Sequence, residues 1–225
     1  MKTLRHPSGT TSHPSPARKS RRALLLGLGA TALLPMLAGC FPVVATGVSA
    51  GAAMISDRRT SGTYLEDESI EWKVSSRIRE RFGNSVHVNA TSYNRNVLLS
   101  GEAPNDTIRG ELDGIVAGVE HVRGVINEVV VGPNSALTAR GNDTLITSNV
   151  KARFVDAGRF SAHNVKVVTE ANVVFLMGIV TRAEADAAAE VARTSQGVRK
   201  VVRVFEYISE EEARRLDNPT GAQPQ

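Results

Sequence analysis

The apolar positions of this chain follow one pattern that occurs twice, in residues 67–131 and again in residues 143–208. Each copy opens with three apolar residues spaced four apart and continues with runs in which apolar and polar residues alternate. The four-residue spacing places side chains on one face of a helix, whereas alternation is typical of a β-strand. The opening triplets are Ile70, Val74 and Ile78 in the first copy and Ile146, Val150 and Phe154 in the second.

An aspartate stands just before each triplet, Asp67 in the first copy and Asp143 in the second. A short polar side chain at the start of a helix accepts hydrogen bonds from the free N–H groups of the first turn. We therefore predict that the two helices begin at these aspartates, which would act as N-caps.

Two alternating runs around a polar turn follow each of these helices, and a second helix and a third strand complete the copy. The second helices are expected over residues 104–119 and 181–195, and the third strands over 125–131 and 201–207. The order α-β-β-α-β predicts an α+β fold in which a small three-stranded sheet carries both helices on one face.

The repeated unit resembles the BON domain, a small module of bacterial envelope proteins. The resemblance rests on the Asp-x-x-Ile start of each copy, on the strands that end in LLSGEA and FLMGIV, and on the closing VRGVINEVVV and VRKVVRVFEY. We therefore expect two tandem BON domains, at 67–131 and 143–208, joined by a linker at 132–142. The tail at 209–225 should form one or two charged helical turns and then be disordered.

The N-terminal segment 1–39 has the plan of a secretory signal peptide, with six basic residues and no acid followed by an uncharged apolar run. The sixteen uncharged residues 23–38 are fewer than the ~20 that a membrane-spanning helix needs.

Leu37 to Cys40 resembles the bacterial lipobox. That resemblance implies cleavage before Cys40 and attachment of diacylglycerol and an N-acyl chain to it. A lipidated tether would then span residues 40–66. The alternative for a lone cysteine is a packed or free thiol.

The basic charge of the chain comes from this same segment. The whole chain has 27 basic and 23 acidic residues, and without the six basic residues of 1–39 it has 21 basic and 23 acidic. The charge therefore gives no argument for a nucleic-acid partner, and none is expected. Arg21 and Arg22 also resemble a twin-arginine export signal, so the export route stays open.

Catalytic and metal-binding motifs are missing from the sequence. The histidines His87, His121 and His163 have no cysteine or second histidine at the spacing of metal ligands. A Gly-x-Ser-x-Gly string occurs once, at residues 47–51, but it lies in the expected tether and not at a turn between an expected strand and an expected helix, where a nucleophile motif stands. We therefore expect no enzyme activity, no metal site, and no cofactor besides the lipid on Cys40.

The first helix of the second copy carries apolar residues away from its buried face. With Ile146 at zero on a helical wheel, Leu145 lies at about −100°, Ala152 at about −120° and Val155 at about 180°. Cations flank these positions, and an apolar strip edged by cations suits a helix that lies on an anionic membrane. The expected lipid-binding residues are Leu145, Asn149, Lys151, Ala152, Val155 and Arg159.

Two alternatives remain open for this surface. Leu145 and Val155 could instead pack against the first domain or the linker. The equivalent face of the first copy, with Ser69, Ser76 and Arg79, is polar, so the two copies should have different partners.

A lipobox followed by two BON copies resembles the dual-BON lipoproteins of the family. This implies an outer-membrane lipoprotein that faces the periplasm and binds anionic phospholipid, such as phosphatidylglycerol, through its second BON domain. It also implies a role in envelope integrity and collection at division sites. The alternative is a lipid-anchored scaffold that docks on the outer-membrane protein assembly machinery.

Overall fold

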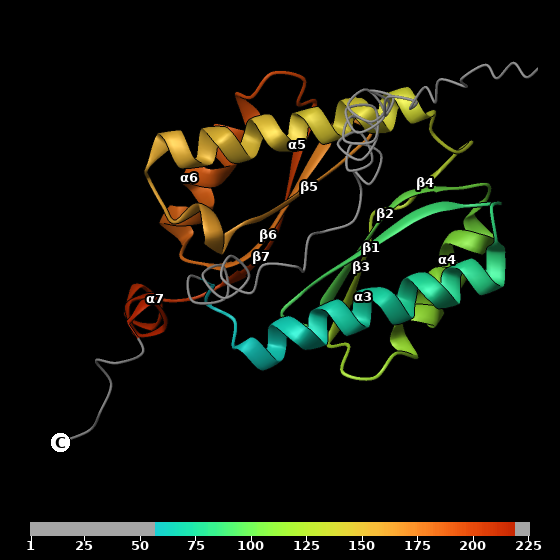
Figure 1. Ribbon diagram of the computed structural model, residues 1–225, viewed down its shortest axis with the longest axis horizontal. Helices are drawn as coiled ribbons and strands as arrows, with labels where there is room; N and C mark the ends of the chain where they lie inside the picture. The colour runs from blue at the N-terminus through green and yellow to red at the C-terminus, as the bar shows by residue number, and fades with distance from the viewer. Residues whose placement is uncertain (1–56, 219–225) are drawn as a thin grey trace, which may run out of the picture. The chain divides into compact units, whose positions relative to one another are not determined.

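The computed structural model describes residues 57–218, all of which belong to one compact unit (Figure 1). The expected signal peptide, Cys40, most of the expected tether and the last residues of the tail lie outside the described residues. Among the described helices, none is both long enough and apolar enough to cross a membrane.

Two α-β-β-α-β units follow one another along the chain, as the pattern predicted. The first contains α3 (Ser61–Phe82), β1 (His87–Tyr93), β2 (Asn96–Ala103), α4 (Asp106–Ala117), β3 (Gly124–Asn127) and β4 (Val130–Val131). The second contains α5 (Leu137–Ala157), a short 3-10 helix (Ala162–Asn164), β5 (Lys166–Glu170), β6 (Val173–Val180), α6 (Arg182–Arg193) and β7 (Lys200–Tyr207). A further helix, α7 (Glu210–Asp217), lies in the expected tail.

Each unit has its own sheet, with the second strand in the middle. In the first sheet β1 pairs with β2 antiparallel, and β3 and β4 pair with β2 parallel. In the second sheet β5 pairs with β6 antiparallel, and β7 pairs with β6 parallel. The expected third strand of the first copy is therefore divided into β3 and β4. The α+β fold of two tandem domains is confirmed.

Both helices of each unit pack on the same face of their sheet (Figure 1). In the first unit, Val97 and Leu99 of β2 meet the triplet of α3 and the apolar face of α4. In the second, Val174 and Leu176 of β6 meet the triplet of α5, and the small alanines of α6 pack closely against them. Each copy thus has a core of its own.

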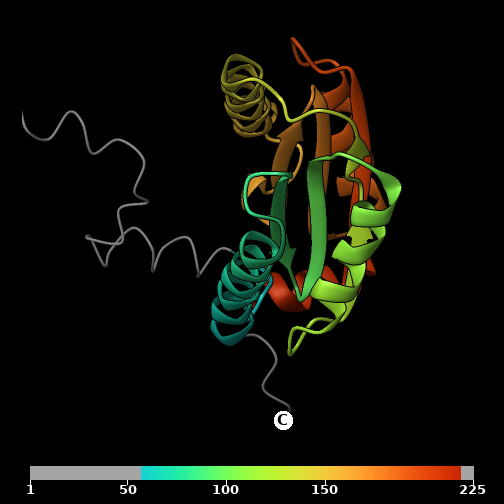
Figure 2. The same ribbon diagram turned by 90° about the vertical axis from the view of Figure 1, so that its right-hand side faces the viewer.

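A third apolar cluster joins the two copies through the sheet faces that point away from their helices. We call it the shared cluster, and its buried members are Tyr93, Leu98, Phe175, Met177 and Ile179. Leu98 lies between Val97 and Leu99 on β2, so strand alternation directs it to the opposite face. The sheets lie between α5 and α3 in the turned view (Figure 2). The copies are therefore in direct contact.

The predicted helix starts are wrong in both copies. Helix α3 begins at Ser61, six residues before Asp67, and its N-cap is Thr60, whose side chain accepts a hydrogen bond from the N–H of Thr63. Helix α5 begins at Leu137, six residues before Asp143. The first turn of α3 therefore lies within the segment expected to be tether. Both aspartates are buried inside their helices.

Asp67 and Asp143 hold the hairpin turns of their own copies. The Asp67 carboxylate accepts hydrogen bonds from the N–H groups of Asn94 at 2.8 Å and Arg95 at 2.7 Å. Asp143 accepts equivalent bonds from Ala171 at 2.9 Å and Asn172 at 2.8 Å. These turn residues all have positive φ, as a tight two-residue hairpin requires. The repeated aspartate therefore joins a helix to a turn.

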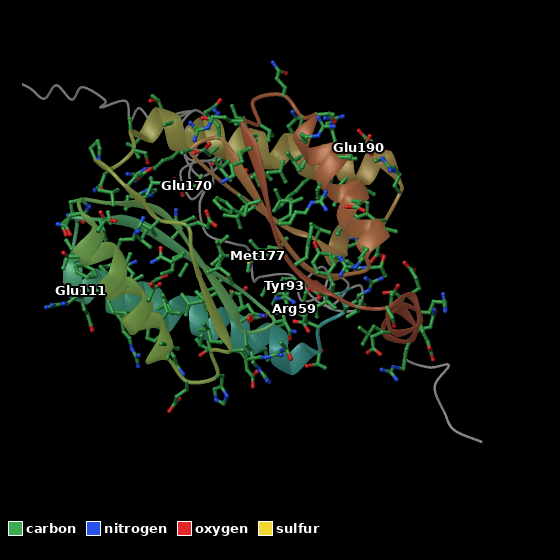
Figure 3. The ribbon with its side chains drawn as sticks, turned by 180° about the vertical axis from the view of Figure 1, so that it is seen from behind. Arg59, Tyr93, Glu111, Glu170, Met177 and Glu190 are labelled. Atoms are coloured by element: carbon green, nitrogen blue, oxygen red, sulfur yellow. The ribbon has the colours of Figure 1, made fainter. Side chains whose placement is uncertain are left out.

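The start and the end of the described chain are tied to the second copy. Arg58, with a side chain only 3% exposed, donates hydrogen bonds to the carboxylates of Glu184 on α6 and Asp217 on α7 and to the carbonyl of Ile179. Arg59 lies over the ring of Tyr93, with 4.0 Å between its guanidinium carbon and the ring centre (Figure 3). Leu216 of α7 packs against the shared cluster. Residues on either side of the two domains are thus part of the fold.

Candidate lipid-binding surface

Helix α5 turns an apolar surface to solvent on the side opposite its core face. Its triplet is buried, whereas Leu145 is 70% exposed and Val155 is 69% exposed. Contact with the first domain or the linker would have covered these two side chains. The packing alternative is therefore excluded for the described part of the chain.

The structure brings the six expected lipid-binding residues to one helix and its C-terminal end. Leu145, Lys151, Ala152, Val155 and Arg159 are exposed, and Asn149 is half-buried. Arg159 lies just beyond Gly158, which ends α5 in the left-handed conformation. Their geometry matches the helical wheel, whereas their role in lipid binding stays a prediction.

Leu137 extends this surface and was missed by the sequence reasoning. It is 80% exposed, and it lies 18 residues before Val155, which corresponds to about five helical turns or ~27 Å on the same side of the helix. Sequence reasoning started the helix at Asp143 and so left Leu137 in the linker. We call Leu137, Leu145, Ala152 and Val155 the α5 strip.

The charges beside the α5 strip are fewer than the sequence suggested. Arg159 donates a hydrogen bond to Glu190 of α6 at 2.9 Å, and this bond lowers the pKa of the Glu190 carboxyl. The positive charge of Arg159 is therefore balanced. Lys151 is exposed and has no ion pair within residues 57–218, so it is a cation beside the strip that can meet an anion, and the exposed Asp156 lies at the other edge of the strip at about −80°.

The first copy also exposes apolar side chains, although the sequence indicated a polar face. Trp72 is 70% exposed and Leu65 is 62% exposed, both on α3. With Ile70 at zero, they lie at about 200° and 220°, directly opposite the buried face, so the same helical wheel could have found them. Glu68 is exposed between them. The exposed Arg79 lies at about 180° on the same side, so the pair on α3 is accompanied by an acid and a cation.

One histidine expected to stand alone has acidic neighbours in the fold. The Nδ1 atom of His87 lies 3.0 Å from a carboxylate oxygen of Glu102, on the neighbouring strand, and 3.9 Å from one of Glu170, in the other copy. Burial raises the pKa of Glu170 above its usual range. His121 and His163 are exposed. Strand pairing and contact between copies cannot be read from sequence spacing, so this group was missed.

Comparison with known proteins places the two repeats in one family. The BON domain family model matches residues 66–133 and 142–209. The chain is 38% identical over 196 residues to the outer membrane lipoprotein DolP of Haemophilus influenzae, covering 86% of this chain and 98% of the relative. It is 35% identical to a 21 kDa hemolysin of Actinobacillus pleuropneumoniae, over 68% of this chain and 79% of the relative.

A more distant relative is the osmotically-inducible protein Y of Escherichia coli, 28% identical over 69% of this chain and 80% of that protein. The family model covers more than half of the chain, and it coincides with the two α-β-β-α-β units. The chain therefore belongs to the BON domain family, and its similarity along nearly all of DolP supports a dual-BON outer-membrane lipoprotein.

Proposed function

We propose that this protein is anchored to the outer membrane by acyl chains on Cys40, faces the periplasm, and binds anionic phospholipid through the α5 strip of its second BON domain. The observation that carries the proposal is the exposure of Leu145 and Val155, about seven-tenths each, on the side of α5 opposite its core. Binding through this surface would support envelope integrity, with collection at division sites. The protein acts as a binding module and has no catalytic role.

The α5 strip supplies a moderate binding energy by itself. Burying one leucine-sized side chain contributes about 1.5–3 kcal/mol, and one lysine at an anionic surface about 1 kcal/mol. Association also costs rotational and translational freedom, which offsets much of this gain. A covalent anchor holds the domain near the bilayer and so raises its effective concentration there. The strip would therefore select the lipid, while the anchor provides attachment.

The anchor rests on the lipobox resemblance at Cys40 and on the likeness to DolP, which is named as an outer membrane lipoprotein. Metabolic labelling with a fatty acid tests it. Labelled protein is expected from the native chain, and none from the Cys40→Ser variant. A labelled Cys40→Ser protein would contradict lipidation at this residue.

Vesicle sedimentation tests the lipid preference. The chain from residue 41 onward is mixed with vesicles of neutral phospholipid alone or with increasing phosphatidylglycerol. Binding should rise with the phosphatidylglycerol fraction and weaken with salt, because Lys151 meets the anionic surface through screened charges. Equal binding to neutral and anionic vesicles would contradict the proposal.

A second candidate function, a scaffold for the outer-membrane protein assembly machinery, has support from α3. Exposed tryptophan is common at the centres of protein interfaces. Trp72 is 70% exposed, and it lies with Leu65 on the side of α3 opposite the core. In this reading Trp72→Ala would abolish cross-linking of the protein to that machinery and leave vesicle binding unchanged. Cross-linking at the native level in the variant would contradict it.

A further inference from the structure

Three side chains with metal-binding atoms meet where the two copies touch. His87 comes from β1 and Glu102 from β2. Glu170, labelled in Figure 3, comes from the end of β5. One ligand atom of each lies within 4.8 Å of the other two. We call these residues the His87 cluster. Two of them belong to the first copy and one to the second.

The His87 cluster is nearly closed to solvent and rich in negative charge. The side chains of His87, Glu102 and Glu170 are 17%, 7% and 9% exposed. The carboxylates of Glu102 and Glu170 both form their ion pair with the His87 imidazole. Asp143 adds a further negative charge near Glu170. Two carboxylates held in a dry site with one imidazole between them are poorly compensated. A bound cation would supply the missing positive charge.

The spacing of the donor atoms suits a transition-metal ion. Metal–ligand distances of about 2.0–2.2 Å place neighbouring ligands of a tetrahedral ion roughly 3.3–3.6 Å apart. The two observed distances from His87 Nδ1, 3.0 Å and 3.9 Å, bracket this value. Small side-chain rotations would therefore bring all three atoms to one ion. One imidazole nitrogen with two carboxylate oxygens is a mixed set that suits zinc and related divalent metals.

Other groups of the fold fix the two carboxylates in place. The Asn89 amide donates to Glu170 at 2.9 Å, and the Ser135 N–H donates to Glu102 at 3.1 Å. Such outer contacts orient ligands in metal sites. Gly101 allows the close approach of β1, because a side chain there would meet the His87 carbonyl oxygen at 2.0 Å. The cluster is therefore held in position by its surroundings.

An entry path is present beside the cluster. A surface cleft of about 480 Å³ is lined by His87 and Glu170, with Asn89, Arg140 and Lys151 also on its wall. Arg140 donates its hydrogen bonds to Ser135, whose own N–H donates to Glu102, so this guanidinium lies beside the cluster without a hydrogen bond to either carboxylate. An ion can therefore reach the cluster from solvent.

The other copy provides an internal comparison. The hairpins of the two copies align with the turn Asn94–Arg95 on Ala171–Asn172. In this alignment the counterparts of His87, Glu102 and Glu170 are Asn164, Ile179 and Tyr93. These counterparts carry neither an imidazole nor a carboxylate. The three metal-binding side chains therefore occur at only one of the two equivalent places in the contact between copies. The repeated fold by itself does not require them.

We propose that His87, Glu102 and Glu170 form a binding site for a divalent transition-metal ion, which fastens the two BON domains to each other. Because its ligands come from both copies, bound metal should stabilise the contact between the two sheets as well as each hairpin. Metal that binds the folded state raises the melting temperature by mass action.

Isothermal titration calorimetry with Zn²⁺ tests the site. The full chain, in detergent and without a histidine tag, is first stripped of metal with a chelator. One Zn²⁺ per chain is expected, and each of His87→Gln, Glu102→Gln and Glu170→Gln should weaken its affinity by at least roughly tenfold. The exposed His163→Gln is the matched control and should bind as the native chain does. Circular dichroism confirms that each variant is folded.

A variant-free measurement covers the case in which a substitution prevents folding. X-ray absorption at the zinc edge of the loaded native chain should show nitrogen and oxygen ligands that include one imidazole. Sulfur ligation would assign the metal to Cys40 and overturn the proposal. So would the lack of saturable Zn²⁺ binding, or native affinity in all three glutamine variants.

Discussion

At the residue scale, the two buried aspartates show how one side chain can serve a different purpose from the one its local sequence suggests. An aspartate before an apolar helical face is typical of an N-cap, yet Asp67 and Asp143 lie one and a half turns inside their helices. A buried carboxylate is costly unless it is hydrogen-bonded. Both find their partners in turns more than 25 residues away. Sequence spacing cannot reveal such a distant partner.

Removing one of these carboxylates should destabilise its copy. Asp143→Ala leaves the half-buried N–H groups of Ala171 and Asn172 without their acceptor, and a hydrogen bond to a charged group contributes about 1.5–3 kcal/mol. Asp156→Ala, on the exposed side of the same helix, is the control and should change the free energy of unfolding by less than about 0.5 kcal/mol. Urea unfolding of both variants measures the difference. Equal effects would contradict the structural role of Asp143.

At the scale of elements, the sequence predicted where helices and strands lie better than where they begin. The buried triplets identified the core faces of α3 and α5, because a four-residue spacing depends only on the helix itself. Helix starts depend on capping, and here Thr60 caps the first helix while Ala136 precedes the second without a side-chain hydrogen bond. The same error hid Leu137 from the candidate site. The shared cluster was missed because packing between sheets leaves no period in the chain.

A charge in the second core tests how far the copies depend on each other. Val150 is fully buried, so Val150→Asp places an unpaired carboxylate in the core at a cost of several kcal/mol. We expect the second domain to unfold. The first should keep its own core but lose the contacts of Tyr93 and Leu98 in the shared cluster.

Hydrogen exchange separates the two effects. In Val150→Asp, amides of β5, β6 and β7 should lose protection, and those of β1 and β2 should exchange faster than in the native chain yet remain protected. Lys151→Asp, one residue further along the helix and exposed, is the matched control for folding. Full loss of protection in both sheets would mean that the first domain cannot fold without the second.

At the scale of the whole molecule, the chain combines an expected lipid anchor with two domains that expose different surfaces. The α5 strip is formed by leucine, alanine and valine, with Lys151 and Asp156 beside it, whereas the surface on α3 is formed by Leu65 and Trp72, with Glu68 and Arg79 beside them. Similar folds can therefore serve different partners, because the exposed apolar side chains outside the core differ between the copies. We expect the membrane to contact the second domain and not the first.

Trp72 reports on this expectation directly, since it is the only tryptophan of the chain. Its fluorescence maximum should stay that of an indole in water when phosphatidylglycerol vesicles are added. A blue shift would show that α3 enters the bilayer interface, where tryptophan is favoured. That result would contradict an assignment of membrane contact to α5 alone.

The variant Leu145→Glu with Val155→Glu tests most directly whether the α5 strip binds anionic lipid. Both side chains are exposed, so the folded state should lose little stability. Each change removes an apolar contact of about 1.5–3 kcal/mol and adds a charge that an anionic surface repels. Affinity for phosphatidylglycerol vesicles should fall at least tenfold, since ~1.4 kcal/mol corresponds to a factor of ten. Ser69→Glu with Ser76→Glu on α3 should leave affinity unchanged. Native affinity in the folded α5 variant would show that this helix is not the lipid-binding surface.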